Sequence, residues 1–333
     1  MTTNQLDTIH PATRMTDTPP LIRWHRPLLV VAAAMLLLAV VLAIARFADP
    51  TEITGANGWD KPLKFALSFA IYSVTWSWLI GQLRGAHRTM TIAGHVIAVM
   101  SVIEVTIIVG AAMAGVTSHY NVASPFATAM WTIMAISITL LWIANLVVVI
   151  GLLRAPLGDA ARTIALRSGA AISLVGLGLA FLMTGPTAKQ LDDFQGIAGA
   201  HTVGMADGGP GIAILGWSTI GGDLRIPHFI GMHALQAIPL LLIALELASR
   251  RVVVLRDVRL RARLTITAAL GYSATVALVT WQALRGQSIV APDVLTLVAA
   301  CVIIVGAVGA GAVIIVRAQS PKKAASTNSV ASF

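Results

Sequence analysis

Eight long apolar stretches dominate the chain and leave few folds open to it. Each is close to the roughly 20 residues that an α-helix needs to cross the hydrocarbon core of a bilayer. The stretches fall near 27–46, 62–83, 91–115, 128–153, 167–185, 226–248, 264–284 and 293–316. We therefore predict an all-α fold, a polytopic integral membrane helix bundle of about eight transmembrane helices.

The composition also favours the bilayer as solvent. Of the 333 residues, 57% are hydrophobic and 11% are charged. Soluble domains carry roughly 25% charged residues, so this chain could not cover a soluble surface, and membrane lipids are its expected partners. The single cysteine, Cys301, lies inside an apolar stretch. It excludes a disulfide within the chain and a cysteine metal cluster.

The basic residues indicate how the chain crosses the membrane. Most of the 23 lysines and arginines lie in alternate connections, and cytoplasmic connections are the ones enriched in Lys and Arg. We predict a multi-pass protein of the cell (inner) membrane with both termini cytoplasmic. The net charge of +9 then reflects topology and contact with lipid headgroups, and no nucleic acid is expected as a partner. The residues behind this prediction are Arg14, Arg23, Arg26, Arg84, Arg88, Arg154, Arg162, Arg167, Arg250, Arg251, Arg256, Arg259, Arg261, Arg263, Arg317, Lys322 and Lys323.

The ends of the chain are polar. We predict a disordered cytoplasmic N-terminus at 1–22, a transmembrane domain at 23–317 and a disordered cytoplasmic tail at 318–333. The first apolar stretch ends in Ala-Ile-Ala, like a signal-peptide cleavage site. Its apolar region of about 18 residues exceeds the 7–15 of a signal peptide, so we predict a retained anchor.

The longest connection, at 186–225, is rich in glycine and is expected on the outer face. It is long for a connector. We predict that it folds back over the helix ends as a lid, because its apolar side chains would gain from burial. The alternative is a flexible tether. The side chains in question are Ile212, Ile214, Leu215 and Trp217.

Two segments expected on the outer face resemble each other, GWDKPLKFALS at 58–68 and GWSTIGGDLRIPHFIG at 216–231. The match is consistent with two four-span halves related by a repeat, although Asp and Pro are common at any helix start. Both segments place bases near a helix N-terminus, which favours an anion. We predict that Lys61, Lys64 and Arg225 lie close together around an anionic group. The alternative is that the lysines extend toward lipid headgroups.

Histidines mark the sixth apolar stretch. At about 100° per residue, His228, His233 and Gln236 fall on one arc of a helix. A polar arc facing lipid is costly, so we expect it to face the protein interior or a water-filled cavity. We also expect at least one of these histidines to approach His119 or Glu104.

Several functions remain open for this set of residues. A non-covalent haem b or a metal ion is one, with metal ligands His228, His233, His119 and His201, and with Gln236, Lys61, Lys64 and Arg225 completing a cofactor site. Quinone or proton chemistry is a second. A pathway for a small polar solute is a third. Simple interhelical hydrogen bonding is the structural alternative.

The combinations WDKPLKF, SHYNVASPF and GGDLRIPHFIGMHALQ resemble those of an uncharacterised family of bacterial polytopic membrane proteins. The resemblance covers most of the chain and implies a class of protein but no activity. Our leading hypothesis is a redox protein that binds haem or a metal. The alternatives are a transporter or channel-like protein, or a non-catalytic membrane subunit, with a homo-oligomer or a partner subunit as further expectations.

Overall fold

The computed structural model describes residues 23–83 and 87–320. The predicted disordered N-terminus at 1–22 lies outside this part of the chain. The predicted tail at 318–333 also lies outside it, except for residues 318–320. Of these, 318 and 319 belong to the last helix, which ends at Gln319.

Helices long and apolar enough to cross a membrane make up most of the described chain. Seven of them qualify alone in these residues, and a bent pair makes an eighth span. This confirms the all-α bundle and makes the chain a multi-pass membrane protein by length and composition. The seven are α1 (Arg26–Ala48), α2 (Asp60–Gly81), α3 (His87–Met113), α4 (Pro125–Arg154), α5 (Ala160–Gly178), α9 (Val258–Leu284) and α10 (Val294–Gln319). A 3₁₀ turn, η1 (Leu179–Met183), extends α5, and η2 (Val253–Arg256) precedes α9.

Short polar side chains fix where several helices begin. Asp159 accepts a hydrogen bond from the backbone N–H of Arg162, and Asp293 does the same for Thr296. Such caps satisfy backbone donors that the first turn of a helix leaves free. The fifth span accordingly begins at Ala160, earlier than the predicted 167. Arg167 is therefore helical, and its guanidinium donates to the carbonyls of Leu152 and Ala155 at the end of α4.

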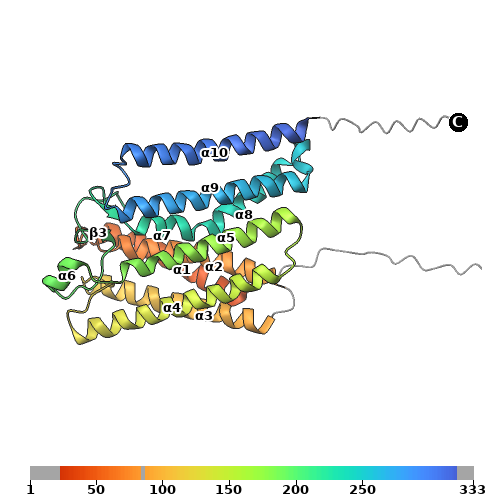
Figure 1. Cartoon of the computed structure of the whole chain (residues 1–333). Helices are drawn as coiled ribbons and strands as arrows, with labels where there is room; N and C mark the ends of the chain where they lie inside the picture. The colour runs from red at the N-terminus through yellow and green to blue at the C-terminus, as the bar shows by residue number, and fades with distance from the viewer. Residues whose placement is uncertain (1–22, 84–86, 321–333) are drawn as a thin grey trace, which may run out of the picture.

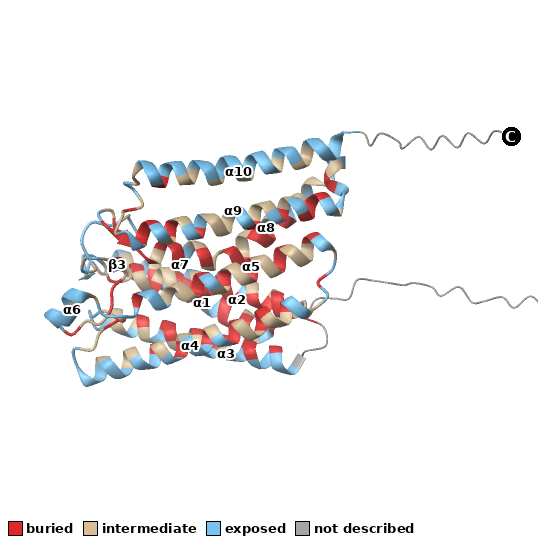
Figure 2. Ribbon diagram, in the orientation of Figure 1, coloured by how far each residue is buried: buried red, intermediate tan, exposed pale blue. Residues whose placement is uncertain are grey.

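The helices run side by side, with their connections at the two ends of the bundle (Figure 1). α1 packs on α2, α3 packs on α4, and α5 lies against α7, α8 and α9. Buried residues concentrate along α1 to α5, whereas α10 packs mainly against α9 and is exposed along most of its length (Figure 2). Trp76 and Leu28 are among the largest fully buried side chains.

The span that corresponds to the sixth apolar stretch of the sequence is broken. α7 (Arg225–Met232) and α8 (Ala234–Ala248) meet at His233 with a 40° bend. Two neighbouring helices satisfy carbonyls beside the break, since Ser173 donates to Met232 O at 2.8 Å and Tyr272 donates to Ile230 O at 2.6 Å. Broken helices persist in membranes where neighbours re-satisfy the backbone in this way.

α5 and α7 touch backbone to backbone at this point. A Cβ on Gly176 would lie 2.2 Å from the carbonyl carbon of Gly231. Small residues allow this approach, as at many helix crossings in membranes. The contact holds the break between α7 and α8 against α5.

One end of the bundle, which we call the loop end, carries the long connection between η1 and α7 (Figure 1). A short helix α6 (Ala188–Asp192) opens it, and β3 (Thr202–Val203) pairs antiparallel with β4 (Gly222–Asp223). Ile197 bridges to Asn121 in the α3–α4 connection. A second hairpin, β1 (Glu52–Ile53) and β2 (Ala56–Asn57), lies between α1 and α2.

The long connection is thus folded against the helix ends. Ile212, Leu215 and Trp217 are half-buried, whereas Ile214 is 53% exposed. The expected burial therefore holds for three of these four side chains.

Candidate functional site

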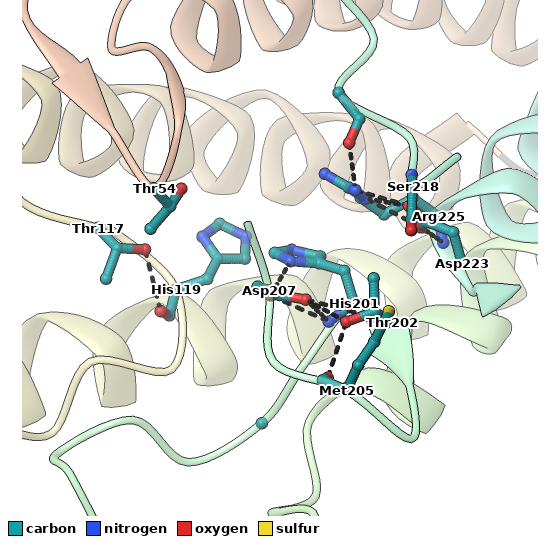
Figure 3. A network of polar contacts seen from close by, with 12 residues as sticks. Thr54, Thr117, His119, His201, Thr202, Met205, Asp207, Ser218, Asp223 and Arg225 are labelled. Atoms are coloured by element: carbon teal, nitrogen blue, oxygen red, sulfur yellow. Dashed lines mark hydrogen bonds and ion pairs between the residues drawn. The ribbon is translucent and has the colours of Figure 1, made fainter. Parts of the chain in front are cut away.

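Polar side chains from distant parts of the chain gather under the long connection at the loop end (Figure 3). They come from the start of α2, the α3–α4 connection, the β3–β4 region and the start of α7. We call this set the loop-end cluster. Its members are Lys61, Lys64, His119, His201, Asp207, Asp223 and Arg225.

Arg225 and Asp223 form an ion pair in which the carboxylate is fully buried and the guanidinium is half-buried. Arg225 Nε lies 2.9 Å from Asp223 Oδ1, and its Nη2 lies 2.6 Å from Oδ2. The Asp223 side chain is fully buried and also accepts from the backbone N–H of Ser218 at 2.8 Å. Arg225 Nη2 donates in addition to Gly216 O. The two-point geometry fixes the guanidinium and ties the connection to α7.

Lys64 lies beside this pair. Its Nζ donates to Leu215 O at 2.8 Å. Lys64 Nζ and Arg225 Nη1 each lie 3.8 Å from the point where a Cβ on Gly216 would stand. The predicted closeness of Lys64 and Arg225 is therefore confirmed. Arg225 Nη1 forms no hydrogen bond with any residue that the structure describes, so both cations keep unused donors at the same place.

Lys61 is half-buried and has no hydrogen-bond or ion-pair partner within 23–83 and 87–320. Its ammonium group lies within electrostatic range of Asp207 at the loop end and of Glu104 inside α3. It is also in range of Arg225. Buried charges are normally paired. Among the cations of the loop-end cluster, Lys61 is the one with neither a hydrogen bond nor an ion pair to a described residue.

Asp207 organises the turn that holds His201. Its carboxylate accepts from the backbone N–H groups of His201 and Thr202, at 2.8 and 3.0 Å, and from the Thr202 hydroxyl. It also pairs with His201 Nδ1. Burial alone would raise the pKa of Asp207, but the hydrogen bond and the charge of His201 lower it to about 2. Burial lowers the pKa of His201, and Asp207 offsets only part of this. A neutral His201 then directs its Nδ1 proton to Asp207 and keeps Nε2 free.

His119 lies next to His201, with 6.3 Å between ring centroids (Figure 3). Its Nδ1 is 3.0 Å from the Ser118 hydroxyl. Burial, together with the charge of Lys61, lowers the pKa of His119. Tyr120 has a left-handed backbone, with φ of 62°, and its ring packs 5.1 Å from that of His201. Strained conformations of non-glycine residues often occur at functional sites.

The histidines of the broken span have hydrogen-bond partners outside the loop-end cluster. His228 Nδ1 donates to Gly176 O at 2.8 Å, and His233 Nδ1 lies 3.1 Å from Gln236 Oε1. Gln236 reaches the Thr75 hydroxyl in α2. Within the described residues, no hydrogen bond or ring contact joins His228 or His233 to His119 or Glu104. The expectation that one of them approaches His119 or Glu104 stays a prediction, although each imidazole already has a hydrogen-bond partner nearby.

The described residues offer no ready site for the predicted metal ion, and the predicted haem stays a hypothesis. Throughout the described residues, no group of three or more His, Cys, Asp or Glu side chains could hold a metal ion. A catalytic zinc needs three protein ligands, and His119 and His201 supply two beside the cation of Lys61. The His119 ring also has four aromatic or imidazole neighbours with centroids within 6.3 Å, namely Phe65, Tyr120, Trp131 and His201.

The sequence did not predict two hydrogen bonds between helices. Ser137 of α4 donates to Glu104 Oε1 at 2.6 Å, inside the bundle. Tyr72 of α2 donates to Asn145 Oδ1 of α4 at 2.8 Å. Serine and tyrosine are common in membrane helices, so neither residue type was a signal by itself. The only available signal was the presence of Glu104 and Asn145 in apolar stretches, since each requires a polar partner.

Comparisons of the chain with protein-family models, curated proteins and solved structures give no match. The function therefore has to be argued from the loop-end cluster.

Proposed function

We propose that the chain binds a small anionic solute at the loop-end cluster and carries it across the membrane. The observation that supports this most is Lys61, a half-buried ammonium group without a partner in the described residues. Lys64 and Arg225 add unused N–H donors beside Gly216. An anion that accepted from these groups would supply the missing countercharge.

The acidic residues of the loop-end cluster do not supply the missing countercharge. Asp207 is engaged by His201 and Thr202, and Asp223 is engaged by Arg225 and Ser218. Both carboxylates therefore stabilise the folded connection. The positive groups retain free donors while the negative groups have few free acceptors, which favours an anion over a cation as the solute.

The broken span supports transport over simple binding. Secondary transporters commonly use discontinuous helices. Here α7 begins at Arg225, in the loop-end cluster, and ends at the bend beside His233. A movement of α7 about this bend would carry Arg225 with it and open or close the site.

The proposal includes an orientation, with the loop end outside and both termini in the cytoplasm. The basic residues of the connections support it through the positive-inside rule. Reporter fusions after Arg88 and Arg263 should show a cytoplasmic signal, and a fusion near Gly208 should show an external one. A cytoplasmic signal at Gly208 would place the cluster on the wrong side for uptake from outside.

Binding by the purified protein tests the proposal directly. We expect acetate or sulfate, measured by calorimetry in detergent, to bind the wild type and to bind the Lys61→Met variant about 10- to 100-fold more weakly. This corresponds to a charge-assisted hydrogen bond of roughly 1.5–3 kcal/mol. Lys189→Met is the matched control, because Lys189 is exposed on α6 and should leave binding unchanged.

An uptake assay in proteoliposomes tests the transport part of the proposal. Proteoliposomes with the wild type should take up labelled acetate or sulfate, and those with Lys61→Met should not. Absence of binding by the wild type, or equal loss in the Lys189→Met control, would overturn the anion proposal. A Soret band in the purified wild type would instead support the haem hypothesis.

A further inference from the structure

Glu104 is a carboxyl group deep in the bundle. It lies well inside α3, away from both helix ends, and is 3% exposed. An ionisable group in this position is costly unless it has a role or a partner. Its one hydrogen-bond partner in the part of the chain that the structure describes is the Ser137 hydroxyl, 2.6 Å from Oε1.

The Ser137 contact accommodates Glu104 with or without a proton. The hydroxyl has one proton, yet it lies 2.6 Å from Glu104 Oε1 and 3.2 Å from Met134 O. An ionised Glu104 would accept the hydrogen bond of the Ser137 hydroxyl. A neutral Glu104 would donate to the Ser137 oxygen, and the hydroxyl would then turn to Met134 O. Each protonation state thus has a complete hydrogen bond without movement of the backbone.

Few titratable groups lie on the helices that pack against α3 around Glu104. α4 has no titratable side chain between Pro125 and Leu153, and the two arginines of α1 stand near its ends. Of the titratable groups of α2, Asp60 is paired with Arg46, and Tyr72 donates to Asn145. Lys61 is the charged group that acts on Glu104. The charged or titratable groups that act on Lys61 or on which it acts are Lys64, Glu104, His119, His201, Asp207 and Arg225.

We propose that Glu104 is a proton-binding site coupled to the anion site, so that a proton and an anion bind together. This inference rests on the proposed function. An anion at Lys61 would neutralise the ammonium that stabilises the Glu104 carboxylate and would add a like charge nearby. Both effects favour the neutral acid, so the carboxylate takes up one proton from solution. By reciprocity, a proton on Glu104 tightens anion binding, which is the requirement for symport.

Sulfate is a suitable probe because it does not titrate near neutral pH. Wild-type affinity for sulfate should fall as the pH rises from 6 to 8, approaching tenfold per pH unit where Glu104 is ionised. Calorimetry in buffers of different ionisation enthalpy should show uptake of about one proton per sulfate in that range. Glu104→Gln should bind sulfate with a weaker dependence on pH than the wild type and should take up about one proton fewer per sulfate. Glu246→Gln, at the other end of the bundle, is the matched control and should behave like the wild type.

A second variant keeps the test decisive if Glu104→Gln folds poorly. Ser137→Ala removes the donor to the carboxylate, so the fall in affinity should move to higher pH. Wild-type binding without a pH dependence, or a dependence that is unchanged in Glu104→Gln, would overturn the coupling while the anion site stands. No sulfate or acetate binding at any pH would overturn the proposed function itself.

Discussion

Replacing Arg225 by Met should lower the free energy of unfolding by about 3 kcal/mol, the lower end of the cost of leaving a buried charge without its partner. Asp223 would remain fully buried, and the backbone N–H groups of Ser218 and of residue 225 would offset only part of its charge. Methionine keeps much of the arginine volume, so the loss would report the charge and its hydrogen bonds. Unfolding in mixed detergent micelles with SDS as denaturant measures the effect.

The matched control is Arg285→Met. Arg285 pairs with Asp293 at the same end of the bundle, but both side chains are more than a third exposed. Exposed pairs contribute about 0–1 kcal/mol. Equal losses for the two variants would contradict the structural role of the Arg225–Asp223 pair. Asp223→Asn should cost less than Arg225→Met, because it leaves a guanidinium that is 29% exposed in place of a fully buried carboxylate.

The sequence predicts the helices well because lipid imposes one simple requirement on them. A crossing helix needs about 20 apolar residues, and every such stretch became a helix or a bent pair. Helix starts are less predictable. Arg162 and Arg167 interrupt the apolar pattern of α5, yet the Asp159 cap and the carbonyls at the end of α4 accommodate them.

The loop-end cluster was predictable only in part. Lys64 and Arg225 were expected together because each lies near a helix start, and both helices begin at the same end of the bundle. The pairing of His201 with Asp207, and its approach to His119, depends on how a long connection folds. No periodicity in the sequence fixes that fold.

His228 and His233 have hydrogen-bond partners that the sequence did not predict. The helix breaks at His233, so the continuous helical arc assumed for these residues is interrupted. Gly176 allows such close approach of α5 that its carbonyl reaches His228. A close glycine contact is a property of helix packing, which a single sequence does not reveal.

Replacing Asp207 by Ala should release the long connection from the helix ends. The variant removes the acceptor for the backbone N–H groups of His201 and Thr202, and for His201 Nδ1. Hydrogen bonds to charged groups contribute roughly 1.5–3 kcal/mol each. We expect a local loss of about 2–4 kcal/mol, or about 30- to 700-fold faster amide exchange at 201–203. Asp193→Ala is the control, because Asp193 is exposed and pairs only with the side chain of nearby Gln195.

The same segment should lose protection in two steps as the pH falls. The folded pKa of His201 is lowered by burial, so the unfolded segment takes up a proton first and stability declines below about pH 6.5. The buried His119 acts in the same direction. The folded pKa of Asp207 is about 2, below its unfolded value of 3.8. Its contribution is complete above pH 4 and is lost between pH 4 and 2. Amide exchange corrected for intrinsic rates should show both steps, and Asp207→Asn should remove the second. Protection at 201–203 that stays constant from pH 7 to pH 3 would contradict the assigned roles of His201 and Asp207.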